Sequence, residues 1–229
     1  MLKAINLSKA YNGKKALNDI SFHVEQGEIF CLLGQNGAGK TTTINLFLGF
    51  IKPDGGSAFI NDEEINNSAL NQKVAYIPEI VQLYGNLSGV ENLDFFSRLA
   101  GFTYSKDELS EFLSQAGLQA EAHYLSLSSY SKGMRQKVGI AVAIAKNADV
   151  IFMDEPTSGL DPKATAEFTS ICKNLVAAGK TIFMATHDIF NAVNVGTSIG
   201  IMKEGSLVQQ IQTKNINAEQ LKQLYLETI

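Results

Sequence analysis

Hydrophobic and polar residues alternate in the first part of the chain and then give way to unbroken apolar runs. In "DISFHVEQGE", apolar residues at 20, 22 and 24 alternate with polar ones, which predicts a half-buried strand that ends in a turn at Gln26–Gly27. The run "EIFCLL" (28–33) is typical of a strand buried on both faces. We therefore expect an antiparallel unit that leads into a buried sheet. Further strands are predicted at "MLKAINLSKAY" (1–11), "SAFIN" (57–61) and "KVAYI" (73–77).

The apolar spacing changes to a helical repeat between about Leu87 and Lys146. One of the helices in this region should begin with a capping box, because Ser105 and Glu108 form the pattern Ser-x-x-Glu. Glycines at the ends of two apolar stretches are typical helix stops. The predicted helices are "VENLDFFSRLAG" (90–101), "SKDELSEFLSQAG" (105–117) and "SKGMRQKVGIAVAIAKN" (131–147).

Three apolar runs follow, and each ends near polar residues. "DVIFMDEP" (149–156), "TIFMATHD" (181–188) and "SIGIMKEG" (198–205) are typical of parallel core strands with helices between them. "NAEQLKQLYLE" (217–227) predicts a short amphipathic helix, and a helix should also run from Lys40 to about Gly49. The predicted fold is α/β, with a single domain over 1–229. Its core would comprise 1–86 and 147–229, and residues 87–146 would form an inserted helical subdomain.

Composition narrows the class of protein. A chain of 229 residues that is 45% hydrophobic can bury a full core. A net charge of −4 argues against a nucleic-acid partner, since such binding depends largely on Lys and Arg. Cys31 and Cys172 lie in apolar runs and are too few for a disulfide framework, so we expect two core residues in a reducing cytosol. The sequence shows no signal peptide and no apolar run of about 18–20 residues, which indicates a soluble chain that can still have a membrane-embedded partner.

A glycine-rich loop after the strand at 28–33 is the strongest chemical signal. It satisfies G-x-x-x-x-G-K-[ST], and it lies between a predicted strand and a predicted helix, which argues against a chance glycine turn. Glycines let backbone N–H groups approach phosphate oxygens, and the helix N-terminus favours an anion. A lysine here can reach the β- and γ-phosphates, and a hydroxyl can ligate Mg²⁺. The expected nucleotide-binding residues in this segment are Gly34, Gln35, Asn36, Gly37, Ala38, Gly39, Lys40, Thr41 and Thr42.

Two adjacent carboxylates, Asp154 and Glu155, end the strand of "VIFMDEP". Ligands bind at the carboxyl ends of strands in an open parallel sheet, so Asp154 should face the same edge as the phosphate loop and reach Mg²⁺. Glu155 would then hold the water that attacks the γ-phosphate. The alternative is an acidic pair that caps a strand and performs no chemistry.

Together these motifs resemble the nucleotide-binding subunit of an ABC transporter, in the family's order and over nearly the whole chain. Gly34–Thr42 are similar to its Walker A loop, and Val150–Glu155 to its Walker B strand. "SGLD" (158–161) is similar to the D-loop, and His187 in "ATHD" to the switch histidine. Tyr11 stands where the family places an aromatic residue that stacks on adenine. The resemblance implies a P-loop NTPase (RecA-like) core with an N-terminal antiparallel β subdomain and an inserted α-helical subdomain.

The segment "YSKGMRQ" (130–136) stands where this family has its L-S-G-G-Q signature. The resemblance implies that two copies pair head to tail, so that Ser131 and Gly133 contact the ATP held by the other copy. The alternative is an ordinary helix that Ser131 caps. Lys132 departs from the family's first signature glycine, Tyr130 from its leucine and Met134 from its glutamine.

Glu79 in "AYIPE" stands where the family usually has a glutamine. A carboxylate there can still ligate Mg²⁺, and it also brings negative charge close to the γ-phosphate. The "YIPE…LYGNLSGVENL" pattern resembles bacterial exporter ATPases of the bacitracin-resistance and sodium-efflux kind.

The resemblance implies an enzyme that binds and hydrolyses ATP with Mg²⁺ to power a membrane permease for export. Glu155 and His187 would be catalytic, Thr41, Asp154 and Glu79 would hold the metal, and Asp161 would couple the two sites. The partners would be ATP, a second copy or a paralogous ATPase subunit, and a transmembrane permease, with no nucleic acid. The chain would lie peripherally on the cytoplasmic face of the inner (plasma) membrane, bound through that permease.

Residues 79–93 would form the groove for the permease, because Val81, Leu83, Tyr84 and Leu87 give it an exposed apolar character; the alternative is that they belong to the subdomain core. A soluble ABC-type ATPase of DNA repair or translation is the second class considered. It usually carries a coiled-coil insertion or two fused nucleotide domains, and this sequence has neither. A regulatory module without turnover is the third class, and the presence of Glu155 and His187 argues against it.

Overall fold

The structure is a computed structural model that describes residues 1–65 and 73–228. The strands in these ranges are β1 (Leu2–Tyr11), β2 (Lys14–Val24), β3 (Ile29–Gly34), β4 (Gly55–Ile60), β5 (Glu63–Glu64), β6 (Val74–Ile77), β7 (Val150–Asp154), β8 (Thr181–Thr186), β9 (Ser198–Lys203) and β10 (Ser206–Gln212). The α-helices are α1 (Lys40–Phe47), α2 (Gly89–Leu99), α3 (Lys106–Gln115), α4 (Lys132–Ala145), α5 (Pro162–Ala177), α6 (Ile189–Val195) and α7 (Ala218–Thr228). Within the same ranges, short 3₁₀ turns lie at Ala120–Ala122, Leu127–Ser129 and Thr213–Asn215.

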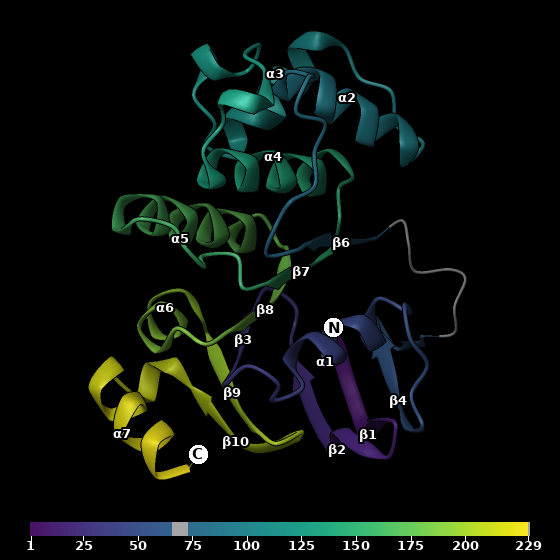
Figure 1. The fold of residues 1–229 in the computed structure, drawn as a ribbon, viewed down its shortest axis with the longest axis vertical. Helices are drawn as coiled ribbons and strands as arrows, with labels where there is room; N and C mark the ends of the chain where they lie inside the picture. Colours follow the sequence, from purple (N-terminus) through teal and green to yellow (C-terminus); the bar gives the residue numbers. More distant parts are fainter. Residues whose placement is uncertain (66–72, 229) are drawn as a thin grey trace.

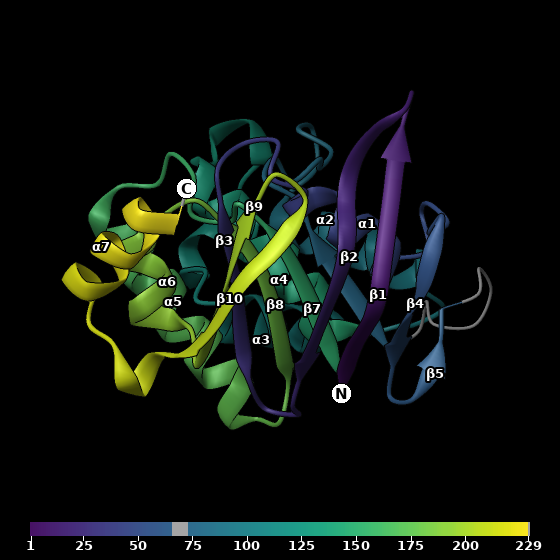
Figure 2. The same ribbon diagram turned by 90° about the horizontal axis from the view of Figure 1, so that it is seen from below.

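Two sheets form the lower part of the molecule, and α2, α3 and α4 gather above them (Figure 1). The larger sheet has the order β10-β9-β3-β8-β7-β6, in which β10 alone runs antiparallel to its neighbour. The smaller antiparallel sheet has the order β2-β1-β4-β5 and lies beside it (Figure 2). The parallel strands place their carboxyl ends along one edge, where the loops after β3, β7 and β8 meet.

The central strands β3, β7 and β8 of the larger sheet are buried on both faces, as their apolar sequences predicted. Successive residues of a strand point to opposite faces, so Phe152 packs with α1 and the smaller sheet, whereas Met153 packs with the helices α4 to α7. Five phenylalanines fill the first of these layers, with ring centroids 5.3 to 6.1 Å apart. Rings of this size dominate the burial energy of a core. They are Phe22, Phe30, Phe47, Phe152 and Phe183.

Polar side chains cap the helices between β6 and β7, and the cap at Ser105 was predicted from the sequence. Ser105 and Glu108 form the expected capping box of α3, with the Glu108 N–H donating to Ser105 Oγ at 3.3 Å. The same device starts α2, where Ser88 accepts from the Glu91 N–H at 3.3 Å. The apolar faces of α2 and α3 pack on each other and on α4, and α4 in turn packs on β6.

The α/β fold class is confirmed, and the structure corrects some details. Helix α1 ends at Phe47, before the expected end at Gly49. Strand β10 was not predicted, because "SLVQQIQ" lies at the edge of the sheet with few buried side chains and pairs with β9 through its backbone. The division into a core of 1–86 and 147–229 with a helical subdomain of 87–146 stays a prediction.

Candidate nucleotide-binding site

The glycine-rich loop lies between the end of β3 and the start of α1. Gly39 precedes the helix with φ of 106°, and a Cβ at this position would lie 2.5 Å from the carbonyl oxygen of Ala16, so only glycine fits. Lys40 is buried, and its ammonium group donates to the carbonyl oxygens of Gly34 at 2.7 Å and Gln35 at 3.2 Å. The loop is therefore curled around the lysine that the sequence assigned to phosphate binding.

Asp154 and Thr41 meet across the edge of the sheet. The Thr41 hydroxyl donates to Asp154 Oδ2 at 2.8 Å, although the two residues are 113 positions apart. Asp154 Oδ1 is buried without a hydrogen-bond partner in the described part of the chain. Burial raises the pKa of the Asp154 carboxyl, and the nearby charges of Glu155 and Glu79 add to this, while the Thr41 hydroxyl and Lys40 oppose it. Such a buried, unpartnered carboxylate oxygen could ligate a cation.

Glu155 connects the phosphate-loop lysine to the predicted switch histidine. Its backbone is left-handed, with φ of 45°, and its N–H donates to the carbonyl of Ala185 at 2.9 Å. Glu155 Oε1 lies 3.2 Å from Lys40 Nζ, and Oε2 lies 2.8 Å from His187 Nδ1. A carboxylate can only accept, so this geometry places a proton on Nδ1. The strained backbone holds the carboxylate between β7 and β8, since such outliers persist only where the surroundings fix them.

A cavity of about 320 Å³ opens beside the phosphate loop, Asp154 and Glu155. It brings together most of the predicted phosphate-loop residues, the proposed metal ligands and Glu155. The sequence did not single out Ala16, which reaches this cavity from β2 and carries no chemical signal. Tyr11 does not line it; this side chain is 46% exposed, with the Lys9 ammonium 5.7 Å from its ring centroid. The lining residues are Ala16, Asn36, Gly37, Gly39, Lys40, Thr41, Thr42, Glu79, Asp154 and Glu155.

Ser131, Gly133 and Asp161 lie elsewhere, around a separate cavity of about 240 Å³ between α4 and α5. Ser131 caps α4, because its Oγ accepts from the Met134 N–H at 3.3 Å. Asp161 caps α5 in the same way, accepting from the Ala164 N–H at 2.8 Å. A single chain therefore uses both side chains as helix caps and does not bring them to the phosphate loop.

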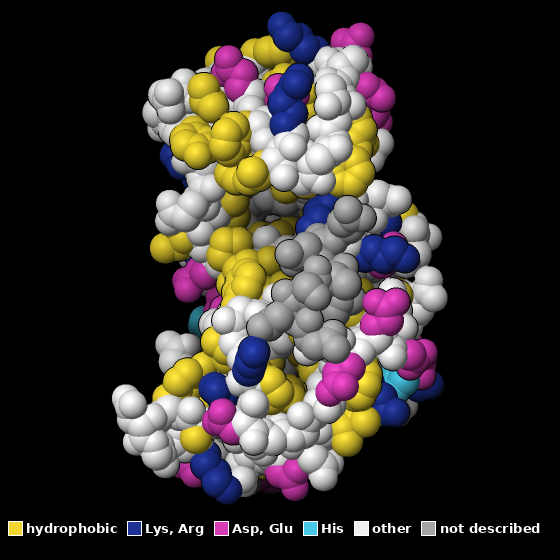
Figure 3. All heavy atoms as spheres, turned by 90° about the vertical axis from the view of Figure 1, so that its right-hand side faces the viewer, with side chains coloured by type: hydrophobic (Ala, Val, Ile, Leu, Met, Phe, Trp, Pro, Cys, Tyr) yellow, Lys and Arg dark blue, Asp and Glu magenta, His cyan; other side chains and the backbone are white. Residues whose placement is uncertain are grey.

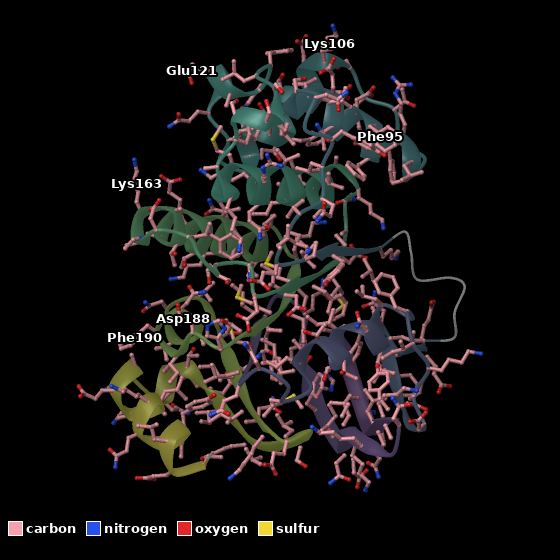
Figure 4. The ribbon with its side chains drawn as sticks, viewed as in Figure 1. Phe95, Lys106, Glu121, Lys163, Asp188 and Phe190 are labelled. Carbon is pink, nitrogen blue, oxygen red and sulfur yellow. The ribbon has the colours of Figure 1, made fainter. Side chains whose placement is uncertain are left out.

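The apolar residues in the loop after β6 divide between the core and the surface. Val81 and Leu83 pack against the main core, so the alternative of a subdomain core holds for these two. Tyr84 is 48% exposed and forms an aromatic cluster with Phe95, at 4.9 Å between ring centroids, and with Phe96, at 6.3 Å. Phe95 projects from α2 in Figure 4, and Figure 3 shows hydrophobic side chains gathered on this side of the molecule.

Within residues 1–65 and 73–228, no group of three or more His, Cys, Asp or Glu side chains is arranged so that it could hold a metal ion. Over the same ranges, none of the helices combines the length and the apolar character needed to cross a bilayer.

Comparison with known proteins places these features in a family. The profile of the ABC transporter family matches residues 17–158. The bacitracin transport ATP-binding protein BcrA of Bacillus licheniformis is 34% identical over 99% of this chain and 74% of its own length. The linearmycin resistance ATP-binding protein LnrL of Bacillus subtilis is 32% identical over 91% of this chain and 68% of its own.

A solved dimeric ATP-binding cassette in a post-hydrolysis state, bound to ADP and Pi, superposes with a TM-score of 0.82. It is 26% identical and covers 93% of this chain and 99% of its own. The family match spans more than half of the chain, and the relatives include exporter-type ATP-binding proteins, as the motifs implied. The chain therefore belongs to the ABC transporter family, as one of its ATP-binding proteins.

Proposed function

We propose that this chain is the ATP-hydrolysing subunit of an ABC exporter, and that two copies close around two ATP molecules to power a membrane permease. The observation that carries the proposal is the convergence of Lys40, Thr41, Asp154, Glu155 and His187 at one edge of the sheet. These residues come from the start of α1 and the ends of β7 and β8, and together they would supply a phosphate clamp, a metal-binding pair and a base.

Mg²⁺ fits the residues that are present. Thr41 and Asp154 offer oxygen atoms, and Asp154 Oδ1 is buried and unpartnered. Glu79 lines the same cavity and offers a further carboxylate. Mg²⁺ binds oxygen ligands and commonly keeps several waters beside substrate phosphates, so a site with few protein ligands is typical of it. When bound, the ion would neutralise phosphate charge.

The ion pair between Lys40 and Glu155 suggests how nucleotide binding prepares the base. Glu155 Oε1 lies 3.2 Å from the Lys40 ammonium but has no hydrogen-bond partner among the described residues. Phosphate oxygens would compete for the ammonium, and Oε1 would then accept a hydrogen bond from water. Glu155 would act as the general base or polarise that water. His187 would orient Glu155 through the 2.8 Å contact and reach the γ-phosphate with its other ring nitrogen. Tyr11 would stack on adenine at the rim of the site.

The second half of the site would come from another copy, identical or paralogous. A Cβ at Gly133 would meet its nearest neighbour, Ala164 Cβ, at 3.6 Å, which is ordinary contact, so nothing in the described chain requires a glycine there. An approaching phosphate would require one. The N-terminus of α4 favours an anion, and Ser131 adds a hydroxyl. Asp161 would couple the two sites across the interface.

A permease would dock where the exposed aromatic cluster of Tyr84 and Phe95 meets the helical group, which we propose acts as one unit over 87–146. The export assignment rests on the relatives, which are named for bacitracin transport and linearmycin resistance. The chain would then lie on the cytoplasmic face of the inner (plasma) membrane, with no nucleic-acid partner. Cysteine cross-linking from Tyr84→Cys to an integral membrane protein in native membranes would support this surface, and a failure to cross-link would count against it.

The decisive test of the enzyme is ATP turnover by Glu155→Gln. We expect a loss of about 10²–10⁴-fold with ATP binding retained, because the amide keeps the size of the side chain and removes the base. Glu25→Gln is the matched control, since Glu25 lies away from the cavity and pairs with His23 at 3.3 Å. Turnover by Glu155→Gln close to that of the wild type would refute the assignment.

A further inference from the structure

Three segments of one chain meet at a single oxygen of Glu79. The Ser158 hydroxyl, from the turn after β7, donates to Glu79 Oε1 at 2.9 Å. The ammonium group of Lys132, the first residue of α4, lies 3.9 Å from the same oxygen. Glu79 itself follows β6 and lines the nucleotide cavity. The cluster therefore connects the helical group to the wall of the cavity.

The charged side chains that line the nucleotide cavity are mostly negative. Among the described residues that line it, the carboxylates of Glu79, Asp154 and Glu155 stand against the single ammonium of Lys40. The negative charge of Glu79 also helps to raise the pKa of Asp154. A triphosphate would add further negative charge to this surface. Without a counter-ion, Glu79 would repel it.

The position of Lys132 in its helix supports a role outside the helix. A cation in the first turn opposes the helix dipole, which favours anions there. The first turn of α4 holds no acidic residue, so no charge within that turn offsets the cost. The Lys132 ammonium instead lies over the turn that carries Ser158. It is 3.8 Å from the position that a Cβ would occupy if Gly159 had one. Glu79 is the carboxylate that it meets in this position.

We propose that Lys132 is a positioning residue that offsets the charge of Glu79 and, together with Ser158, holds its Oε1, so that the other carboxylate oxygen can face the magnesium of an entering triphosphate. The proposal rests on the proposed function of the site and assigns to it a residue outside the phosphate loop. Lys132 acts through Glu79, and its removal should weaken nucleotide binding more than it slows the chemical step.

The test is a double-mutant cycle on the full chain with Lys132→Met, Glu79→Gln and both together, and with Lys132→Arg as the rescue. We expect Lys132→Met to raise KM for MgATP about fivefold with little change in kcat. A fivefold change corresponds to about 1 kcal/mol, which is the upper end of what a partly exposed ion pair contributes. Lys132→Arg should restore KM. In the Glu79→Gln background, Lys132→Met should change KM less than about twofold. The effect should shrink in about 0.5 M NaCl, because salt screens exposed charges.

Lys73→Met is the matched control, because Lys73 forms a comparable ion pair with Asp149, at 3.8 Å, at the opposite ends of β6 and β7. A rise in KM that is equal in both backgrounds would overturn the proposal. The same double-mutant cycle, measured by thermal unfolding without nucleotide, separates the Lys132–Glu79 proposal from the proposed ATPase function. If Glu79 and Lys132 show no coupling there, the proposal fails even in an active ATPase. If they are coupled in a chain that never hydrolyses ATP, the proposed function fails and the ion pair stands.

Discussion

Replacing Asp154 by asparagine should stabilise the chain while removing its response to magnesium nucleotide. Asp154 is 8% exposed, its Oδ1 has no partner, and Glu155 and Glu79 add negative charge nearby. The Thr41 hydroxyl can still donate to the amide oxygen of an asparagine. An asparagine would place its amide nitrogen where Oδ1 lacks a partner, so the substitution removes only the additional cost of the charge. An unsatisfied buried polar group costs about 1–3 kcal/mol, and more when it is charged. We therefore expect Asp154→Asn to raise the free energy of unfolding by about 1–2 kcal/mol at pH 7, or about 3–6 °C in Tm for a chain of this size.

The pH dependence of this gain follows from the raised pKa of Asp154. Between the unfolded and the folded pKa, the folded chain binds more protons than the unfolded chain, so its stability falls as pH rises through this window. The cost is absent below the unfolded value of about 3.9 and fully present above the folded pKa. The difference in stability between Asp154→Asn and wild type should therefore grow from acidic pH to pH 7.

The assay is thermal unfolding without nucleotide at several pH values, and then with saturating MgATP. Bound ligand stabilises the folded chain, so the wild type should gain stability with MgATP and Asp154→Asn should gain much less. Asp149→Asn is the control, since Asp149 pairs with Lys73 at the partly exposed opposite end of β7, and a surface change of this kind stays within about 0.5 kcal/mol. If Asp154→Asn is less stable than wild type at pH 7, the carboxylate is not a charge held for a cation and the reasoning is wrong.

Three further outcomes test other parts of the site. His187→Ala should lower ATP turnover about 10- to 100-fold, because one hydrogen bond to the charged Glu155 is lost; normal turnover would contradict this. Tyr11→Ala should weaken ATP binding by about 1–3 kcal/mol in an equilibrium titration, and unchanged affinity would show that the ring packs only locally. Gly39→Ala should lower Tm and abolish nucleotide binding, since its Cβ would meet the carbonyl of Ala16 at 2.5 Å; a stable, binding variant would show that the loop rearranges freely.

The sequence predicted the buried strands well because they carry unbroken apolar runs, and it predicted the starts of α3 and α4 because Ser105 and Ser131 are local caps. It predicted that Asp154 faces the phosphate loop, because parallel strands share an edge. These inferences needed only local pattern and one topological rule. The edge strand β10 was missed, since its stability depends on backbone pairing with β9 rather than on burial.

The contacts between distant polar groups were beyond the sequence. Nothing in the pattern indicates that Glu155 bridges Lys40 and His187, because this depends on a left-handed backbone at Glu155. Nor does it indicate that Lys132 and Glu79 meet, although both were noted as departures from the family's motifs. The sequence left open whether Val81 and Leu83 are exposed or belong to the core, and in the structure they fold back on the core.

The central claim is that two chains together form each triphosphate-binding site. One chain supplies the phosphate loop, and the other supplies the N-terminus of α4. Measuring the mass of Glu155→Gln in solution with and without MgATP tests it most directly, with Ser131→Ala and Gly133→Asp combined in the same background as the comparison. The account predicts a nucleotide-dependent dimer for Glu155→Gln and a monomer that still binds ATP when the α4 terminus is altered. A chain that binds MgATP and stays monomeric at every concentration, or an equally stable dimer of the altered variant, would contradict it.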